Sequence, residues 1–174
     1  MKKILFTLVA AFMTASAAAQ SVQVAQAMQL DGMPFSFKMH QGKAMVIVYM
    51  SASCPACHDA VPFINKLYKD YSQDEVYIAG AFPKESPQEL ASFKTKFYPS
   101  FPLLYKTQKL QAIAPLRTNA LPTFVIINKK HRTTARVAGL KKDEIRAELD
   151  KALAGAAPEA PGESGKQVLD IKIH

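Results

Sequence analysis

The fold is decided by residues 44–58, which read AMVIVYMSASCPACH. The first seven of these form a continuous apolar run rich in β-branched side chains, a pattern typical of a buried central strand. From Pro55 to Tyr71 the apolar residues change to a helical period, which predicts an amphipathic helix. Cys54 and Cys57 are the only cysteines in the chain and lie at this junction. The segment therefore predicts a buried strand that runs through a corner with two thiols into a helix.

The spacing of the two cysteines favours redox chemistry over structural cross-linking. Side chains three positions apart share one helix face, so Cys54 and Cys57 can close a disulfide. A ring this small stabilises little, because the chain-entropy model gives about 2 kcal/mol, against nearly 5 kcal/mol for a loop of about 100 residues. We therefore interpret the pair as one that opens and closes during function.

The position of each cysteine predicts its role. Unpaired N–H groups and the positive end of the helix dipole favour a thiolate at a helix start. Cys54 is thus predicted to be the more exposed thiol and the attacking nucleophile. Cys57, one turn inside, is predicted to attack the mixed disulfide and release the partner. Pro55 suits the first helical turn, where its missing N–H costs nothing.

The rest of the chain alternates between strand and helix patterns. A hairpin turn signal, Asp31-Gly32, divides residues 22–37. The apolar periodicity then predicts strands at 75–81, 101–105, 123–128 and 133–138, and helices at 87–97, 108–116 and 141–153. This order predicts an α/β fold around a mixed sheet.

The two ends have compositions unlike that of the central region. Residues 1–19 have a positive start, a short apolar core and a small-residue cleavage site, which together predict a cleaved secretory signal peptide and a periplasmic location. An uncleaved signal acting as a membrane anchor is the minor alternative. Residues 20–153 are predicted to form one domain, and residues 154–174 a flexible tail. Within that tail, 168–173 are open between a short strand and a partner-binding segment.

The basic charge of the chain does not indicate a nucleic-acid partner. The formal net charge is +8 at pH 7. A denser basic stretch between Lys129 and Lys142 has no interleaved aromatic residues, which a nucleic-acid platform would need. The composition therefore predicts a solvated basic face and a mild preference for acidic partners. It predicts nothing about the oligomeric state.

A second motif lies far along the chain from the cysteines. Leu121-Pro122-Thr123 precedes the apolar strand that starts at Phe124, and Pro62 interrupts the helix after Cys57. With these motifs in this order, the region from about Asp31 to Leu153 resembles the thioredoxin superfamily, and specifically its secreted TlpA/ResA-like thiol-disulfide oxidoreductases.

The resemblance implies a thioredoxin-like fold with a central mixed β-sheet flanked by helices. It also implies a TlpA-like insertion, around Ser86 to Tyr105, between the helix of the two cysteines and the strand after Pro122. In this family the proline at the Pro122 position is cis and faces the disulfide. Leu121, Pro122 and Thr123 would then shape the substrate groove, where the Leu121 backbone pairs with an extended client segment.

By the same resemblance, the protein would reduce disulfide-containing secreted client proteins such as apocytochromes. A membrane-bound dithiol partner would supply the electrons, and no bound cofactor is implied. The runner-up is an oxidase or isomerase that forms or reshuffles disulfides. Pro55 and Ala56 between the cysteines, with His58 after them, are expected to influence the reduction potential, but their sequence does not decide its direction.

The sequence departs from the family pattern at two positions close to the cysteines. Ser53 stands where tryptophan commonly precedes the first cysteine, and the chain contains no tryptophan. The acid that thioredoxin buries beneath its disulfide falls at an apolar position here, around Val48. Glu85 is a candidate proton acceptor in its place, but an exposed loop carboxylate is the simpler interpretation.

Other classes of function remain open at this stage. Cys54, Cys57 and His58 also match the attachment motif of a c-type haem, with the histidine as axial ligand. The same three side chains are soft ligands suited to copper, although structural zinc generally requires four. An inert disulfide in a binding module is a further possibility. For His58, an ordinary position on the helix surface is the simplest interpretation.

Overall fold

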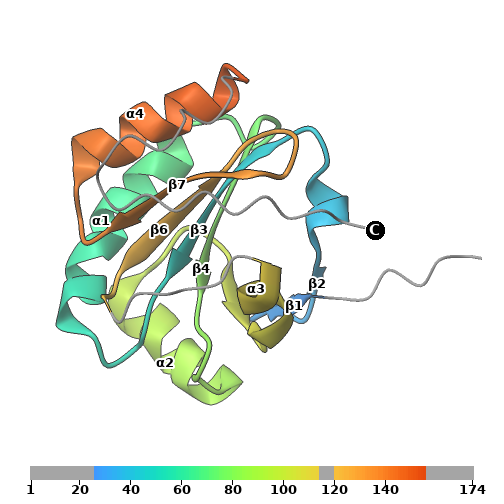
Figure 1. Ribbon diagram of the computed structural model, residues 1–174. Helices are drawn as coiled ribbons and strands as arrows, with labels where there is room; N and C mark the ends of the chain where they lie inside the picture. Colours follow the sequence, from blue (N-terminus) through green and yellow to red (C-terminus); the bar gives the residue numbers. More distant parts are fainter. Residues whose placement is uncertain (1–25, 114–119, 156–174) are drawn as a thin grey trace, which may run out of the picture.

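The computed structural model describes residues 26–113 and 120–155 (Figure 1). Within them, seven strands form one sheet in the order β2-β1-β5-β4-β3-β6-β7. The strands are β1 (Ala27–Gln29), β2 (Pro34–Phe35), β3 (Ala44–Tyr49), β4 (Val76–Ala81), β5 (Leu103–Tyr105), β6 (Thr123–Ile127) and β7 (Thr133–Ala138). The helices are α1 (Pro55–Asp70), α2 (Pro87–Phe97), α3 (Gln108–Ile113) and α4 (Lys142–Leu153), with a short 3-10 helix η1 (Phe37–His40).

The sheet is mixed, as the sequence predicted. Strand β3 pairs in parallel with β4 and antiparallel with β6, and β4 pairs in parallel with β5. The remaining neighbours, β6 with β7, β1 with β5 and β1 with β2, are antiparallel. In the β3–β6 register, Tyr49 lies opposite Thr123. The end of β3 and the start of β6 therefore lie side by side, although they are distant in the sequence.

Two apolar cores cover the two faces of the sheet, because successive strand side chains point to opposite sides. Val46 and Val48 of β3 pack with α1, α2 and α4. Met45, Ile47 and Tyr49, from the same strand, pack with η1 and with Leu110 of α3. Figure 1 shows α1 and α4 on one side of the sheet and α3 on the other. Every residue of β3 is buried, which explains why its sequence is apolar without alternation.

The predicted elements agree closely with the structure in the described residues. The Asp31-Gly32 turn joins β1 to β2, with Gly32 in the left-handed region at φ +89. The strand predicted at 101–105 begins later, at Leu103, because Pro102 has no N–H to donate to a ladder. The helix predicted at 108–116 is described only to Ile113. The predicted signal peptide, and the tail beyond Gly155, lie outside the described residues.

The helix and strand that the resemblance assigned to an insertion correspond to α2 and β5. Their status as an insertion stays a prediction. Helix α2 begins with a capping box, in which the Ser86 hydroxyl accepts from the Glu89 backbone and the Glu89 carboxylate accepts from the Ser86 N–H. None of the helices in residues 26–113 and 120–155 is long and apolar enough to cross a membrane.

Candidate active site

The corner between β3 and α1 is held by backbone hydrogen bonds, one to a neighbouring strand and one within the corner itself. Met50 donates its N–H to the Ala81 carbonyl at 3.0 Å, which ends the parallel pairing of β3 with β4. The chain then turns, and the Cys54 N–H donates to the Ser51 carbonyl at 3.2 Å. Pro55 occupies the first turn of α1, as predicted, and Cys54 is the residue that caps the helix.

Cys54 and Cys57 lie next to one another at this helix start, both as free thiols. The Cys54 sulfur accepts a hydrogen bond from the Cys57 backbone N–H at 3.3 Å, so it takes the place of an ordinary capping oxygen. Cys54 is half-buried, whereas Cys57 has no exposed surface. The prediction that Cys54 is the more exposed of the two is confirmed.

The buried thiol of Cys57 is held in its protonated form. Burial is the main cause that raises the pKa of Cys57 to about 12, and the neighbouring Cys54 thiol acts in the same direction. The negative charge of Glu85 also raises this pKa, and a backbone hydrogen bond at Ser51 lowers it. At neutral pH, Cys57 is therefore a poor nucleophile until its proton is removed.

The segment before β6 reaches the same corner from the other side. The Cys54 thiol donates to the Leu121 carbonyl oxygen, with 3.8 Å between sulfur and oxygen. The Leu121–Pro122 peptide bond is cis, and Pro122 is buried. Thr123 is also buried, with its hydroxyl donating to the Ala120 carbonyl at 2.6 Å. The β3–β6 register is what brings this segment to the cysteines, because it aligns the end of one strand with the start of the other.

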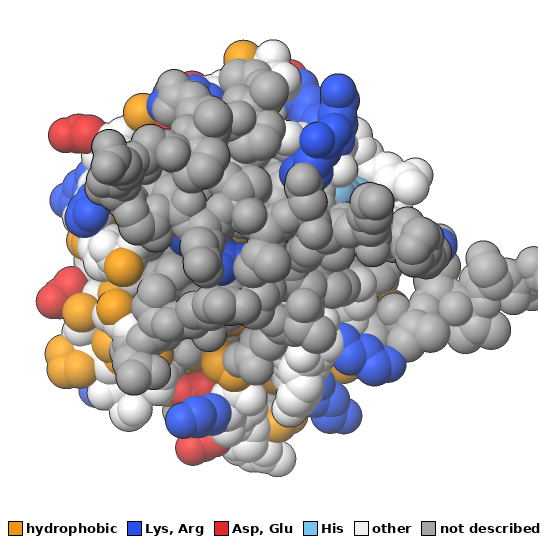
Figure 2. Space-filling view, in the orientation of Figure 1, with side chains coloured by type: hydrophobic (Ala, Val, Ile, Leu, Met, Phe, Trp, Pro, Cys, Tyr) orange, Lys and Arg blue, Asp and Glu red, His pale blue; other side chains and the backbone are white. Residues whose placement is uncertain are grey.

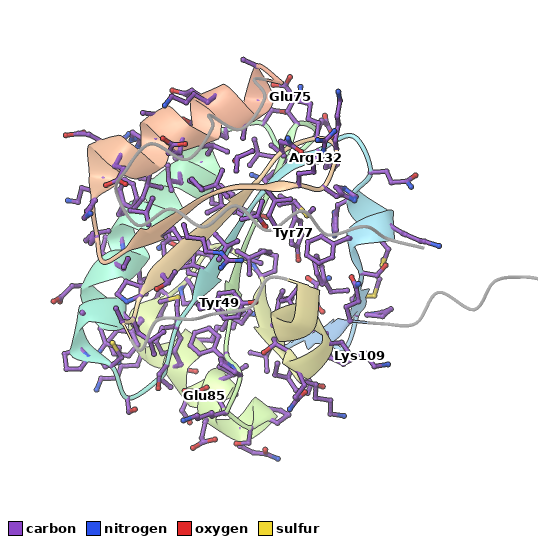
Figure 3. The ribbon with its side chains drawn as sticks, viewed as in Figure 1. Tyr49, Glu75, Tyr77, Glu85, Lys109 and Arg132 are labelled. Carbon is purple, nitrogen blue, oxygen red and sulfur yellow. The ribbon has the colours of Figure 1, made fainter. Side chains whose placement is uncertain are left out.

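Two side chains hold the backbone of Ala52, two residues before Cys54. The Ala52 N–H donates to Glu85 Oε1 at 2.9 Å. The Ala52 carbonyl oxygen lies 2.8 Å from His58 Nε2, and the His58 ring stacks on Phe97 of α2 with 4.1 Å between ring centroids. Figure 3 shows Glu85 at the end of the molecule where α2 begins. The corner is thus held by α1, by α2 and by the loop that joins β4 to α2.

A pocket of about 360 Å³ opens beside this corner, between the start of α1 and α2. Its lining combines aromatic rings with charged groups: Phe93, Phe97, Glu85, Glu89 and Lys96. His58 forms part of the wall together with Ala52 and Ser53. The pocket therefore lies beside the residues that directly precede Cys54.

The chain is similar to known proteins in sequence and in fold. A family model described as Redoxin matches residues 14–153. The chain belongs to the Redoxin family. The thiol-disulfide oxidoreductase ResA of Geobacillus thermodenitrificans strain NG80-2 is 24% identical over 122 residues, 70% of each chain. ResA of Bacillus anthracis is 25% identical over 124 residues, again 70% of each chain.

Solved structures show the same fold. A secreted disulfide oxidoreductase of Mycobacterium tuberculosis, homologous to E. coli DsbE, has a TM-score of 0.59 and 22% identity, covering 71% of this chain and 92% of that one. A thiol:disulfide interchange protein of the thioredoxin family from Chlorobium tepidum TLS has a TM-score of 0.63 and 19% identity, covering 72% and 90%. This Redoxin-family protein is therefore a TlpA/ResA-like member of the thioredoxin superfamily and a thiol-disulfide oxidoreductase, as predicted.

Three aromatic residues near the corner, Tyr49, Phe82 and Tyr105, lie in or beside the core of this Redoxin-family protein. Tyr49 and Phe82 have no exposed surface, and Tyr105 is half-buried. Val48, at the position of the family's buried acid, is also fully buried. The surface residues between the cysteines, Pro55 and Ala56, are exposed.

Two expectations for polar side chains near the cysteines are corrected. Glu85 is half-buried and hydrogen-bonded to the corner, where the simpler interpretation was an exposed loop carboxylate. His58 is likewise half-buried, bonded and stacked, where it was expected on an ordinary helix surface. The sequence held one signal for His58, its place directly after Cys57, but no local pattern pointed Glu85 towards Ala52.

The geometry does not favour the haem or metal alternatives in this Redoxin-family protein. Nε2 of His58, which would have to reach a haem iron or a metal, is directed at the Ala52 carbonyl. Cys57, which would carry one thioether bond, is fully buried. In residues 26–113 and 120–155, no group of three or more His, Cys, Asp or Glu side chains is placed to hold a metal ion.

Basic side chains do not gather in one patch on the face seen in Figure 2. In the view of Figure 2, Lys and Arg side chains lie in several separate groups, with acidic side chains between some of them. Several are paired, for example Arg146 of α4 with Asp70 of α1 at 2.9 Å. Within the predicted basic stretch, Lys130, Arg132, Lys141 and Lys142 are exposed.

Proposed function

We propose that this thiol-disulfide oxidoreductase works in the periplasm as a reductant of disulfides in secreted client proteins. Cys54 is the nucleophile and Cys57 the resolving thiol. The observation that carries the roles of the two thiols is the asymmetry of the pair. One sulfur is reachable and accepts an N–H hydrogen bond at a helix start, whereas the other is fully buried behind it.

The reaction needs no cofactor to balance. The Cys54 thiolate attacks one sulfur of a client disulfide, forms a mixed disulfide, and displaces the other client sulfur, which takes up a proton. Cys57 then loses its proton, attacks the Cys54 sulfur, and displaces the second client thiolate. Two electrons and two protons have then passed from the pair to the client, and a partner dithiol restores the thiols.

The backbone hydrogen bond from Cys57 to Cys54 supports the assignment of the nucleophile. An N–H directed at a sulfur stabilises its negative charge, as do the other free N–H groups of a first helical turn. The same N–H would stabilise Cys54 as the leaving thiolate when a partner dithiol reduces the disulfide.

Leu121, Pro122 and Thr123 are proposed to bind the client backbone beside the disulfide. Support comes from the hydrogen bond between the Cys54 thiol and the Leu121 carbonyl, which brings this segment into contact with the reacting sulfur. An extended client segment that paired with Leu121 would present its cysteine to Cys54. Pro55, Ala56 and His58 flank the pair and would tune its potential.

The reducing direction is proposed from the likeness to the ResA thiol-disulfide oxidoreductases. The pKa of Cys57 bears on the rate of exchange and not on its direction, because a thiol is protonated at neutral pH both at its ordinary pKa of 9.0 and at about 12.

Location and partners follow from the relatives and from the first residues of the chain. Residues 1–19 are proposed to be a cleaved signal peptide, and the similar Mycobacterium tuberculosis protein is described as secreted. A membrane-bound dithiol protein is proposed as the electron donor, as the resemblance to TlpA/ResA-like proteins implies. The acceptors would be secreted proteins with accessible disulfides.

Two measurements test the proposal. The first is the equilibrium of purified mature protein with a dithiothreitol or glutathione series, for which we expect a potential well below that of glutathione. A potential well above it would assign the protein to the oxidases or isomerases instead. The second compares Cys54→Ala, expected to abolish exchange with a model disulfide, with Cys57→Ala, expected to accumulate mixed disulfides. Equal loss without a trapped adduct in Cys57→Ala would contradict the assigned roles.

A further inference from the structure

The backbone of Ala52 is bonded on both sides by side chains from other elements. Its N–H donates to Glu85 at 2.9 Å, and its carbonyl lies 2.8 Å from His58 Nε2. Because a carbonyl oxygen only accepts, Nε2 of His58 must carry the hydrogen. Both the neutral Nε2–H tautomer and the imidazolium provide this donor. The contact therefore does not depend on the charge of the ring.

The hydrogen bond from His58 spans the segment that carries both cysteines. It joins residue 52, two positions before Cys54, to residue 58, directly after Cys57. Within this segment the Cys57 N–H already donates to the Cys54 sulfur, and the His58 N–H donates to the Cys54 carbonyl at 3.2 Å. The side-chain hydrogen bond of His58 joins the two ends of the segment from residue 52 to residue 58.

The ring of His58 is itself anchored. It stacks on Phe97 with an interplanar angle of 21° and lies 6.0 Å from the centroid of Phe93. Phe93 is buried in the core beneath α2. The donor is therefore supported by α2, so its position relative to Ala52 follows from the packing of the two helices.

We propose that His58 is a positioning residue for disulfide exchange, whose Nε2–H clamps the Ala52 peptide and so holds Cys54 within reach of Cys57. In the step concerned, Cys57 gives its proton to water and its sulfur attacks Cys54 in the mixed disulfide. The S–S bond to the partner breaks, and the partner sulfur leaves with the bonding pair and takes a proton from water. A fixed Cys54 raises the effective concentration of Cys57 at that bond.

Two variants separate the hydrogen bond from the stacking. His58→Phe retains a ring against Phe97 but has no donor, whereas His58→Gln retains an N–H of similar reach but no ring. The readout is the equilibrium constant between the glutathione mixed disulfide at Cys54 and the internal disulfide. A hydrogen bond worth about 1 kcal/mol corresponds to about fivefold in this constant. The potential of His58→Phe should therefore be less negative by about 20 mV, and His58→Gln should stay within about twofold of the parent.

The outcomes discriminate between positioning and stability. An unchanged constant in His58→Phe, an equal loss in both variants, or a shift to a more negative potential would each overturn the proposal. Should His58→Phe fail to fold, Phe97→Leu removes the ring that supports His58, and its constant is expected to fall in the same direction. No change in Phe97→Leu would then overturn it.

The inference rests on the exchange roles proposed for the two cysteines. Measurements on the parent protein distinguish a failure of those roles from a failure of the role proposed for His58. A parent that forms no internal disulfide with glutathione would contradict those roles. A normal parent with an unmoved His58→Phe would contradict only the positioning role of His58.

Discussion

Glu85 Oε1 lies 2.9 Å from the backbone nitrogen of Ala52, whose N–H donates to it. A carboxylate from the loop after β4 is thereby bonded to the corner that leads into Cys54. The same negative charge is one of the causes that raise the pKa of Cys57, after burial and the neighbouring Cys54. Glu85 thus stabilises the geometry of the corner while it opposes thiolate formation at the resolving cysteine.

Replacing Glu85 with glutamine should ease the deprotonation of Cys57. The amide introduced by Glu85→Gln keeps an oxygen that accepts from Ala52 but carries no charge, so the pKa of Cys57 should fall. We expect Cys57 to be alkylated about two- to threefold faster at a given alkaline pH. The measurement uses a Cys54→Ala background, so that only one thiol reacts. Slower alkylation in the glutamine variant would instead identify Glu85 as a proton acceptor for Cys57.

The reduced protein should lose stability at alkaline pH through Cys57. The pKa of this thiol is raised to about 12 in the folded protein from 9.0. Between these values the folded protein binds more protons than the unfolded chain, so the free energy of unfolding falls as pH rises. The slope is at most about 1.4 kcal/mol per pH unit.

A control is needed because burial raises the pKa of Tyr71 to about 12, and this tyrosine acts in the same direction. Urea unfolding of the reduced parent and of Cys57→Ala, compared from pH 8 to pH 10.5, isolates the thiol, since both proteins share the tyrosines. Parallel pH profiles for the two proteins would show that Cys57 is not buried as described.

His40 should contribute to the loss of stability in acid. Burial, and then the charges of Lys43 and His131, lower the pKa of His40 from 6.5 to about 4. Between these values the unfolded chain binds a proton that the folded protein does not, so stability is lost as pH falls from 6.5 to 4. Because the ring is half-buried, we expect about 1 kcal/mol from this residue.

The matched variant is His40→Phe, which keeps a ring against Tyr77, whose centroid lies 3.9 Å away. Its free energy of unfolding should fall less steeply between pH 6.5 and 4 than that of the parent, measured by urea unfolding. A variant with the same acid limb as the parent would exclude His40 as the titrating group.

Strand β4 should not tolerate a side chain at Gly80, one residue before its end. A Cβ there would lie 3.0 Å from a ring carbon of Phe101 and 3.1 Å from one of Phe82. We expect Gly80→Ala to destabilise the fold by about 1 to 3 kcal/mol, as overpacked cores do. Adding Phe101→Leu should recover part of that loss by making room. A double variant that is as unstable as the sum of the two single variants would contradict the proposed contact.

Much of the fold could be predicted because its signals are local. The apolar run of β3 and the periodicity of α1 predicted the strand, the helix and the corner between them. A strand buried on both faces has consecutive apolar residues, whereas a helix buried on one face has apolar residues every three or four positions. The hairpin turn was predicted from Asp31-Gly32, because glycine readily adopts the positive φ that such a turn requires. In the structure the φ of Gly32 is +89. Strand β5 begins after Pro102, two residues later than the apolar pattern predicts, because proline lacks the N–H for the ladder.

The pairing of distant segments was reached only through the resemblance to a family. Leu121 carries no pattern that points to Cys54, and their contact depends on β6 pairing beside β3. Strand patterns specify which face is buried but not which strand is the neighbour. The structure supplies this pairing directly, through the opposed positions of Tyr49 and Thr123.

By itself, the sequence determined the chemistry of this protein: two thiols at a helix start, one reachable and one buried, on an α/β fold. Tertiary structure decided which polar groups surround them. Glu85 and His58 meet at Ala52 because α1, α2 and the loop after β4 pack against the same corner. The apolar periodicity of a segment indicates which of its surfaces is removed from water. A hydrogen bond between a side chain and a distant backbone group depends instead on how the elements pack together, and no local sequence pattern indicates that packing.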